Sequence, residues 1–126
     1  IAMYRSKSQK VPYIVFDDEM FRQVSIKQRL ETDLRQALDK RELFLVYQPV
    51  VDLPNKNVVG FEALLRWQRQ EKVISPLDFI PLAEETGLIV PIGAWVLEEA
   101  CKQLKIWMQD WGRSDLYVTV NISSRQ

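Results

Sequence analysis

The stretch Gly60-Phe61-Glu62-Ala63-Leu64-Leu65-Arg66-Trp67 predicts a β-strand with two unlike faces. Successive side chains of a strand point to opposite sides of the sheet. One side carries only apolar residues, namely Val59, Phe61, Ala63, Leu65 and Trp67. The other side carries Gly60, Glu62, Leu64 and Arg66. The apolar side predicts packing against a second layer, while the opposite side presents an acid and a base.

Glu62 and Arg66 are not expected to form a salt bridge with each other. Four residues of strand span about 13 Å, whereas an ion pair brings its charged atoms within about 4 Å. Each side chain is therefore expected to have a partner elsewhere, such as another residue, a metal or a ligand, or to be solvated. The pattern alone leaves a structural role and a functional role open.

The residues before this strand predict a helix and the first arm of a hairpin. Ser25 with Gln28 fits a capping box, so a helix is expected from Ser25 after a polar junction over 17–24. A near-continuous apolar run over 43–53 predicts a buried strand, in which Pro49 indicates an edge or a bulge. A turn at 54–57 then brings Gln48 near the strand of Glu62.

The residues after this strand predict a charged loop, two helices and a further strand. The loop covers 68–72. Ser75 caps the first helix, with Pro76 at its first position, and Gly87 ends it. The second helix covers 91–111, and its tryptophans and Cys101 are expected in the core. A strand over 117–122 places Asn121 on its polar face. A hairpin followed by a helical crossover into a third strand predicts an α/β layered fold.

Composition excludes several classes of function. The chain has 126 residues and no histidine, which excludes Ser-His-Asp and Cys-His catalysis and His-ligated zinc within it. Lys plus Arg and Asp plus Glu both number 17, so net charge gives no attraction to a nucleic acid polymer. A metal site would need oxygen ligands, which suit Mg²⁺ or Mn²⁺. No membrane-spanning run or signal peptide is visible, and the single cysteine suits a cytoplasmic location.

Four segments in order resemble the EAL domain family, the bacterial cyclic di-GMP phosphodiesterases. They are Tyr47-Gln48-Pro49, Glu62-Ala63-Leu64-Leu65-Arg66-Trp67, the run from Ser75 to Ile89 that begins Ser-Pro-Leu-Asp-Phe-Ile-Pro-Leu, and Val120-Asn121-Ile122-Ser123. The resemblance runs from about Leu30 to Gln126. It implies the amino-terminal half of a modified TIM (β/α)₈ barrel with an antiparallel first strand.

The resemblance also implies an activity and a set of site residues. The family hydrolyses cyclic di-GMP to linear pGpG by a two-metal mechanism, with Mg²⁺ or Mn²⁺ as the cofactor. Glu62 and Asn121 match metal ligands. Gln48, Leu64 and Arg66 match substrate-binding positions. The family's remaining acidic ligands and its catalytic lysine fall beyond residue 126, so the chain alone is expected to be inactive.

The first residues resemble the carboxyl-terminal tail of a GGDEF (diguanylate cyclase) domain, with a helix over 1–9 and a strand over 13–16. The expected organisation is this tail over 1–17, a linker helix over 18–40 and the EAL part over 41–126. The parent could be membrane-anchored, with this part in the cytoplasm. A half-barrel exposes strand edges and apolar surface, so a homodimer or other self-association is expected. The alternatives are a non-hydrolytic cyclic di-GMP receptor, a protein-interaction module, or an unassigned α/β domain.

Overall fold

The structure is a computed structural model that describes residues 17–121. The chain divides into two compact units, residues 1–33 and 34–126, and each is considered by itself. The helix expected over 1–9, the strand expected over 13–16 and the segment from Ile122 onward lie outside the described residues.

Helix α1 (Asp18–Ala37) begins seven residues before the expected start. The Asp17 carboxylate accepts a hydrogen bond from the backbone N–H of Met20 at 2.8 Å, and so caps the first turn. Asp18 and Glu19 place further negative charge in this turn, where the helix dipole favours it. The prediction of a cap at Ser25 is therefore wrong, because Ser25 lies inside a helix that a stronger signal has already started.

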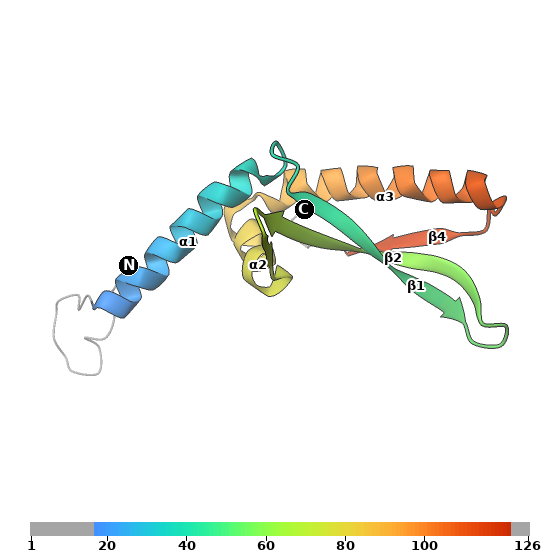
Figure 1. Ribbon diagram of the computed structural model, residues 1–126, viewed down its shortest axis with the longest axis horizontal. Coiled ribbons are helices and arrows are strands. Elements are labelled where there is room, and N and C mark those ends of the chain that lie inside the picture. The colour runs from blue at the N-terminus through green and yellow to red at the C-terminus, as the bar shows by residue number, and fades with distance from the viewer. Residues whose placement is uncertain (1–16, 122–126) are drawn as a thin grey trace. The chain divides into compact units, whose positions relative to one another are not determined.

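The second unit is built on a four-stranded sheet (Figure 1). Its strands are β1 (Leu43–Asp52), β2 (Asn57–Arg69), β3 (Lys72–Ile74) and β4 (Tyr117–Val120). Strand β2 is central: it pairs antiparallel with β1 and β3 and parallel with β4. The hairpin and the parallel crossover strand are as predicted, and the register shifts one residue beyond Pro49, between Val50 and Val51.

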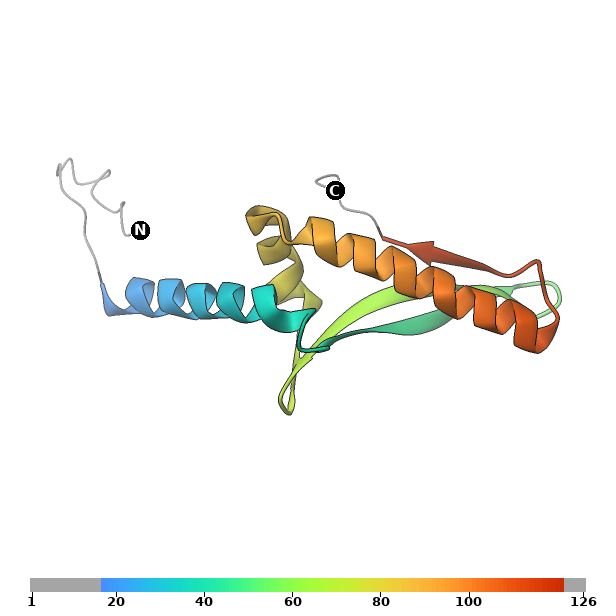
Figure 2. The same ribbon diagram turned by 90° about the horizontal axis from the view of Figure 1, so that it is seen from above.

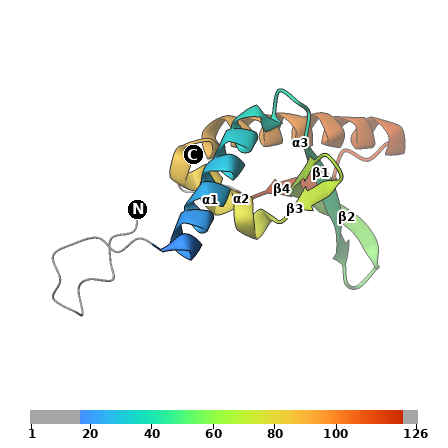
Figure 3. The same cartoon turned by 60° about the vertical axis from the view of Figure 1, so that its left-hand side comes forward.

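The expected loop over 68–72 is wrong, because β2 continues to Arg69 and returns as β3 (Figure 3). The reversal is tight, and Gln70 adopts a φ of 58° to make it. Gln70 is not one of the residue types that favour this conformation. The charged residues of this turn therefore led to the prediction of a loop where the chain forms a hairpin.

The two helices that follow β3 both end at glycines, and the first of them begins after its predicted cap. Helix α2 (Pro76–Thr86) is capped by Ser75, whose hydroxyl accepts from the N–H of Leu77 at 3.2 Å. Gly87 ends α2 with a φ of 83°, and Gly112 ends α3 (Ile89–Trp111) with a φ of 62°. Helix α3 begins two residues earlier than predicted.

The core of this unit lies between the apolar face of β2 and the two helices. Trp67, Phe79 and Ile92 are fully buried, and the Trp67 and Phe79 rings meet edge to face at 5.5 Å. Phe61 and Ala63 are also buried, which confirms the predicted two-faced strand. Figure 2 shows α3 running along the sheet.

The strand predicted to be buried over 43–53 is only partly so, since Val51 is 44% and Leu53 86% exposed. Two residues of α3 that were expected in the core are also exposed. Cys101 directly follows the buried Ala100 and so lies about 100° further around α3, away from the sheet. Trp111, in the last turn, is 51% exposed, although its ring stacks on Trp107 with centroids 5.6 Å apart. Among residues 17–121, no single helix is long and apolar enough to cross a membrane; α2 and α3 meet that test only jointly, with a 119° bend between them.

Candidate functional site

The candidate site lies on the face of β2 that points away from α3. Glu62 is the residue opposite Gln48 on β1 and opposite Thr119 on β4. Asn121 follows the last residue of β4 on the same alternating face as Thr119. The sheet therefore brings Gln48, Glu62 and Asn121 together, although 59 positions of sequence separate Glu62 from Asn121.

Within this group, a hydrogen bond joins Asn121 and Glu62. The Asn121 amide nitrogen donates to a Glu62 carboxylate oxygen at 3.4 Å, a long hydrogen bond. For both side chains to bind one cation, the amide would have to turn so that its carbonyl oxygen, rather than its N–H, faces the carboxylate. A carboxylate and an amide carbonyl are hard oxygen donors, so this donor pair fits Mg²⁺ or Mn²⁺.

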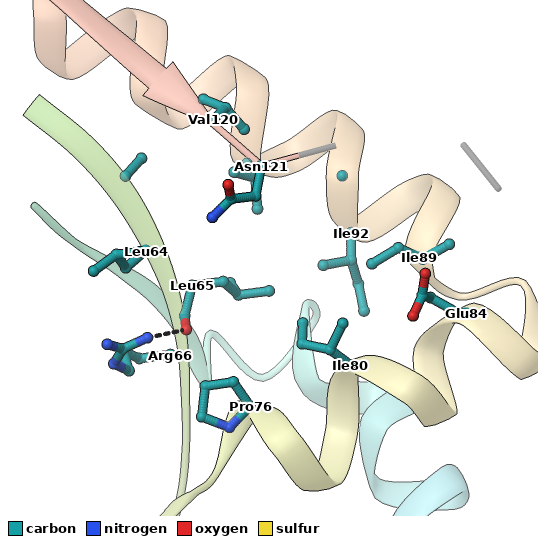
Figure 4. A pocket seen from close by; sticks show the side chains of 13 residues that line it. Leu64, Leu65, Arg66, Pro76, Ile80, Glu84, Ile89, Ile92, Val120 and Asn121 are labelled. Atoms are coloured by element: carbon teal, nitrogen blue, oxygen red, sulfur yellow. Dashed lines mark hydrogen bonds between the residues drawn. The ribbon is translucent and has the colours of Figure 1, made fainter. Parts of the chain in front are cut away.

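Arg66 lies further along the same face of β2, two residues after Leu64. Its guanidinium donates to the carbonyl of Leu65 at 2.8 Å (Figure 4). A guanidinium has five N–H donors, so this bond leaves capacity for a further acceptor. As expected, the bonds made by Arg66 and Glu62 lead to other groups rather than to each other.

A pocket of about 350 Å³ adjoins the site between the strands and the helices. Arg66, Asn121 and Val120 border it from the strands, and Figure 4 shows Ile80 and Ile92 entering from α2 and α3. Its lining is mostly apolar, with the polar groups of Arg66, Asn121 and Glu84 at its border. Ligand pockets commonly combine an apolar lining with a few polar groups.

Sequence reasoning missed two residues that lie around the site. Thr119 faces Glu62 directly, and only the register of β4 on β2 reveals it. Glu84, near the end of α2, is half-buried and borders the pocket. One indication of the place of Thr119 was present in the sequence: residues 117, 119 and 121 alternate along the strand, so Thr119 lies on the same face as Asn121.

The described residues do not by themselves make up a metal site. Among residues 17–121, no three Asp, Glu, Cys or His side chains lie close enough together to bind a cation. Mg²⁺ prefers six oxygen ligands. Glu62 and Asn121 could therefore supply only a minority of the ligands of such an ion.

An antiparallel first strand, a parallel β2–β4 crossover and a polar site beside the end of β4 define the amino-terminal part of a TIM-like α/β barrel. Residues 31–126 match the EAL domain, and the chain belongs to the EAL domain family.

Relatives of known name support this assignment. The chain is 48% identical over 127 residues to the bifunctional diguanylate cyclase/cyclic di-GMP phosphodiesterase MucR of Pseudomonas aeruginosa, covering 99% of this chain and 18% of that protein. It is 44% identical over 127 residues to the cyclic di-GMP phosphodiesterase PdeR of Escherichia coli, covering 99% and 19%. The chain thus spans less than a fifth of either relative.

Solved structures give the same fold. The phosphodiesterase PaMucR in complex with c-di-GMP matches with a TM-score of 0.70 at 54% identity, over 75% of this chain and 38% of that one. The EAL enzyme Bd1971 bound to cAMP and cyclic di-GMP matches with a TM-score of 0.72 at 33% identity, over 82% and 30%.

Proposed function

We propose that this chain is part of a cyclic di-GMP phosphodiesterase that hydrolyses the cyclic dinucleotide to linear pGpG. The observation that carries the proposal is the meeting of Glu62 and Asn121 across β2 and β4, with Arg66 on the same face of β2. The names of MucR and PdeR as cyclic di-GMP phosphodiesterases support it.

Glu62 and Asn121 would hold a divalent cation, Mg²⁺ or Mn²⁺, in a two-metal site. When bound, such ions lower the pKa of a coordinated water and neutralise charge on phosphoryl oxygens. The remaining ligands would come from outside residues 17–121, which contain no group of three suitable side chains. The chain alone is therefore expected not to hydrolyse the dinucleotide.

Arg66, Leu64 and Gln48 would bind the substrate. The Arg66 guanidinium suits a phosphodiester oxygen, because its forked donors match that geometry. Leu64 lies between Glu62 and Arg66 on β2 and offers an apolar surface to a base. Gln48, opposite Glu62, is placed to hydrogen-bond a bound nucleotide beside the metal ligands.

The test is metal-dependent hydrolysis of cyclic di-GMP by the full-length parent and by its Glu62→Ala variant. Turnover to pGpG that requires Mg²⁺ or Mn²⁺ and disappears in this variant would support both the activity and the ligand role. Glu71→Ala, in the exposed β2–β3 turn, is the matched control and should retain turnover. Turnover that survives Glu62→Ala would refute the ligand role.

A second function, a non-hydrolytic receptor, is favoured by relatives described only as binders. The FimX EAL domain of Xanthomonas citri was solved in complex with c-di-GMP and matches at 31% identity with a TM-score of 0.64. Binding of cyclic di-GMP by the parent without turnover would select this function. Loss of binding with the fold intact would instead indicate a protein-interaction module.

The wider organisation of the parent is also part of the proposal. Residues 1–17 would be the tail of a GGDEF domain and 18–40 a linker helix into the EAL part over 41–126. The match to MucR covers 99% of this chain, and that relative is named a diguanylate cyclase as well as a phosphodiesterase, which supports this arrangement. The proposed location is the cytoplasm, in a parent that could be membrane-anchored.

A further inference from the structure

Glu42, the residue directly before β1, connects the end of α1 to the end of β2. Its backbone N–H donates to the carbonyl of Ala37, the last residue of α1, at 2.9 Å, and its own carbonyl accepts from the N–H of Gln68 at 2.9 Å. Its carboxylate accepts from the indole Nε1–H of Trp67 at 3.2 Å. All four residues belong to the same compact unit. Glu42 therefore holds β2 by two bonds, one to the backbone and one to a side chain.

The side chain of Trp67 depends on the acceptor that Glu42 supplies. Trp67 is fully buried, and its indole N–H, the only polar group of the side chain, can act only as a donor. A buried donor left without an acceptor is costly, because it has lost its hydrogen bond to water. The ring also meets Phe79 of α2 edge to face at 5.5 Å. Packing against α2 and one directional bond to Glu42 together fix the orientation of the indole.

The part of β2 that Glu42 holds also carries Arg66. Arg66 directly precedes Trp67, so the guanidinium lies on the site face of the strand and the indole on the apolar face. The ladder between β1 and β2 ends at this point, where Leu43 is opposite Trp67. Ladder ends open more easily than ladder centres. The two bonds from Glu42 therefore secure β2 at the place where its pairing with β1 stops.

The hydrogen bond that Arg66 itself makes does not fix its place in the site. The guanidinium donates to the carbonyl of Leu65, the preceding residue, and this bond moves with the strand. Glu62 lies four residues earlier, about 13 Å along β2, so the bond between Glu62 and Asn121 does not hold this end of the strand. A binding side chain needs to be placed within about 0.5 Å of its productive position. Contacts at the end of β2 must therefore supply that precision.

We propose that Glu42 is a positioning residue for Arg66. Its carboxylate holds the indole of Trp67, and with it the backbone of β2, where the Arg66 guanidinium reaches a phosphodiester group of cyclic di-GMP. Glu42 itself does not touch the dinucleotide and acts through Trp67. This inference rests on the proposed function, because it requires that Arg66 binds the substrate.

The competing explanation is that Glu42 only stabilises the fold. Its removal would then lower the stability of the protein and leave the affinity of the folded protein for its ligand unchanged. Two substitutions at this position isolate the hydrogen bond to the indole. Glu42→Ala removes the acceptor, whereas Glu42→Gln keeps a carbonyl oxygen at the same point of the side chain. Both remove the charge, so a difference between them reports the hydrogen bond.

The test is the dissociation constant of cyclic di-GMP for the full-length parent, measured by isothermal titration calorimetry in EDTA to stop metal-dependent turnover. Arg66→Ala should raise this constant about 10–100-fold, the loss expected for a hydrogen bond to a charged group. Glu42→Ala should raise it about ten-fold, and Glu42→Gln should stay within about three-fold of the wild type. Glu71→Ala, in the exposed β2–β3 turn, is the matched control and should stay within about two-fold.

A double-mutant cycle shows whether Glu42 acts through Arg66. Once the guanidinium is gone there is no side chain left to position, so adding Glu42→Ala to Arg66→Ala should change the dissociation constant by less than about two-fold. A full additional ten-fold loss would overturn the proposal, because Glu42 would then affect the ligand by another route. Thermal melting of each variant by circular dichroism sets a titration temperature at which all of them are folded.

The outcomes separate this inference from the proposed function. A Glu42→Ala parent that melts at a lower temperature but binds cyclic di-GMP as tightly as the wild type would overturn the inference and leave the proposed phosphodiesterase intact. A wild-type parent that binds the dinucleotide without hydrolysing it in Mg²⁺ would refute the phosphodiesterase, while a ten-fold loss in Glu42→Ala would still support the positioning role. Equal losses in Glu42→Ala and Glu42→Gln would also overturn the inference, because the charge rather than the hydrogen bond would then be responsible.

Discussion

Replacing Gly60 with alanine tests whether the contact between β2 and β4 is as tight as the structure indicates. A Cβ added at Gly60 would lie 2.7 Å from a ring carbon of Tyr117 and 2.7 Å from the Tyr117 backbone oxygen. Alanine in a strand is otherwise favoured over glycine by about 0.5–1 kcal/mol. A loss of stability on Gly60→Ala would therefore indicate a steric clash, whereas a gain would indicate an ordinary strand position.

The clash is expected to dominate. The ring can rotate away, but the backbone oxygen can move only if β4 shifts, and overpacking of this kind costs about 1–3 kcal/mol. With an unfolding entropy of about 2.1 cal/mol/K per residue, each kcal/mol lowers the Tm of a chain of this length by about 4 °C. We expect Gly60→Ala to lower the Tm by about 4–11 °C.

A double-mutant cycle with Tyr117→Ala identifies the cause. Removing the ring relieves the contacts with its carbon atoms but not the contact with the backbone oxygen. The cost of Gly60→Ala, measured by urea denaturation, should therefore fall by about 1 kcal/mol in the Tyr117→Ala background without disappearing. A Gly60→Ala chain as stable as the wild type, or more stable, would refute the reasoning.

Two further predictions concern a helix cap and an exposed ion pair. Asp17→Ala should destabilise α1 by about 0.5–2 kcal/mol and lower its helicity by circular dichroism, whereas Ser25→Ala should not; equal losses would contradict the assigned cap. Arg113 hydrogen-bonds the Asp115 carboxylate at 2.7 Å and thereby lowers the pKa of that group. Because the folded pKa lies below the unfolded value, the resulting stability is present near neutral pH and is lost as the pH falls through the folded pKa. Arg113→Ala should accordingly cost more stability by urea denaturation at pH 7 than at pH 3, and an equal cost at both would show that Asp115 is not involved.

The sequence predicted what depends on local periodicity. The alternation around Glu62 predicted the two faces of β2, and the buried Phe61 and Trp67 confirm it. Glycines after apolar helical runs predicted both helix ends, and Gly87 and Gly112 adopt the left-handed conformation expected there.

Features that depend on register or on the phase of a helix could not be predicted. A helix has 3.6 residues per turn, so a shift of one position separates the buried Ala100 from the exposed Cys101. Similarly, a parallel crossover predicted that a strand would join β2, but not that Thr119 would face Glu62. The contact between Asn121 and Glu62 follows only once that register is known.

The same register links the stability of the sheet to the geometry of the site. Strand β4 has only four residues, so its own ladder fixes its position weakly, and a slip of one residue would turn Asn121 to the opposite face. Two contacts besides the ladder hydrogen bonds oppose such a slip. Arg113 donates to the carbonyl of Val58 at 2.9 Å, and Tyr117 lies against Gly60, where only glycine fits. Substitutions at Arg113 and Gly60, neither of which is a proposed ligand, should therefore impair the proposed metal binding through the position of Asn121.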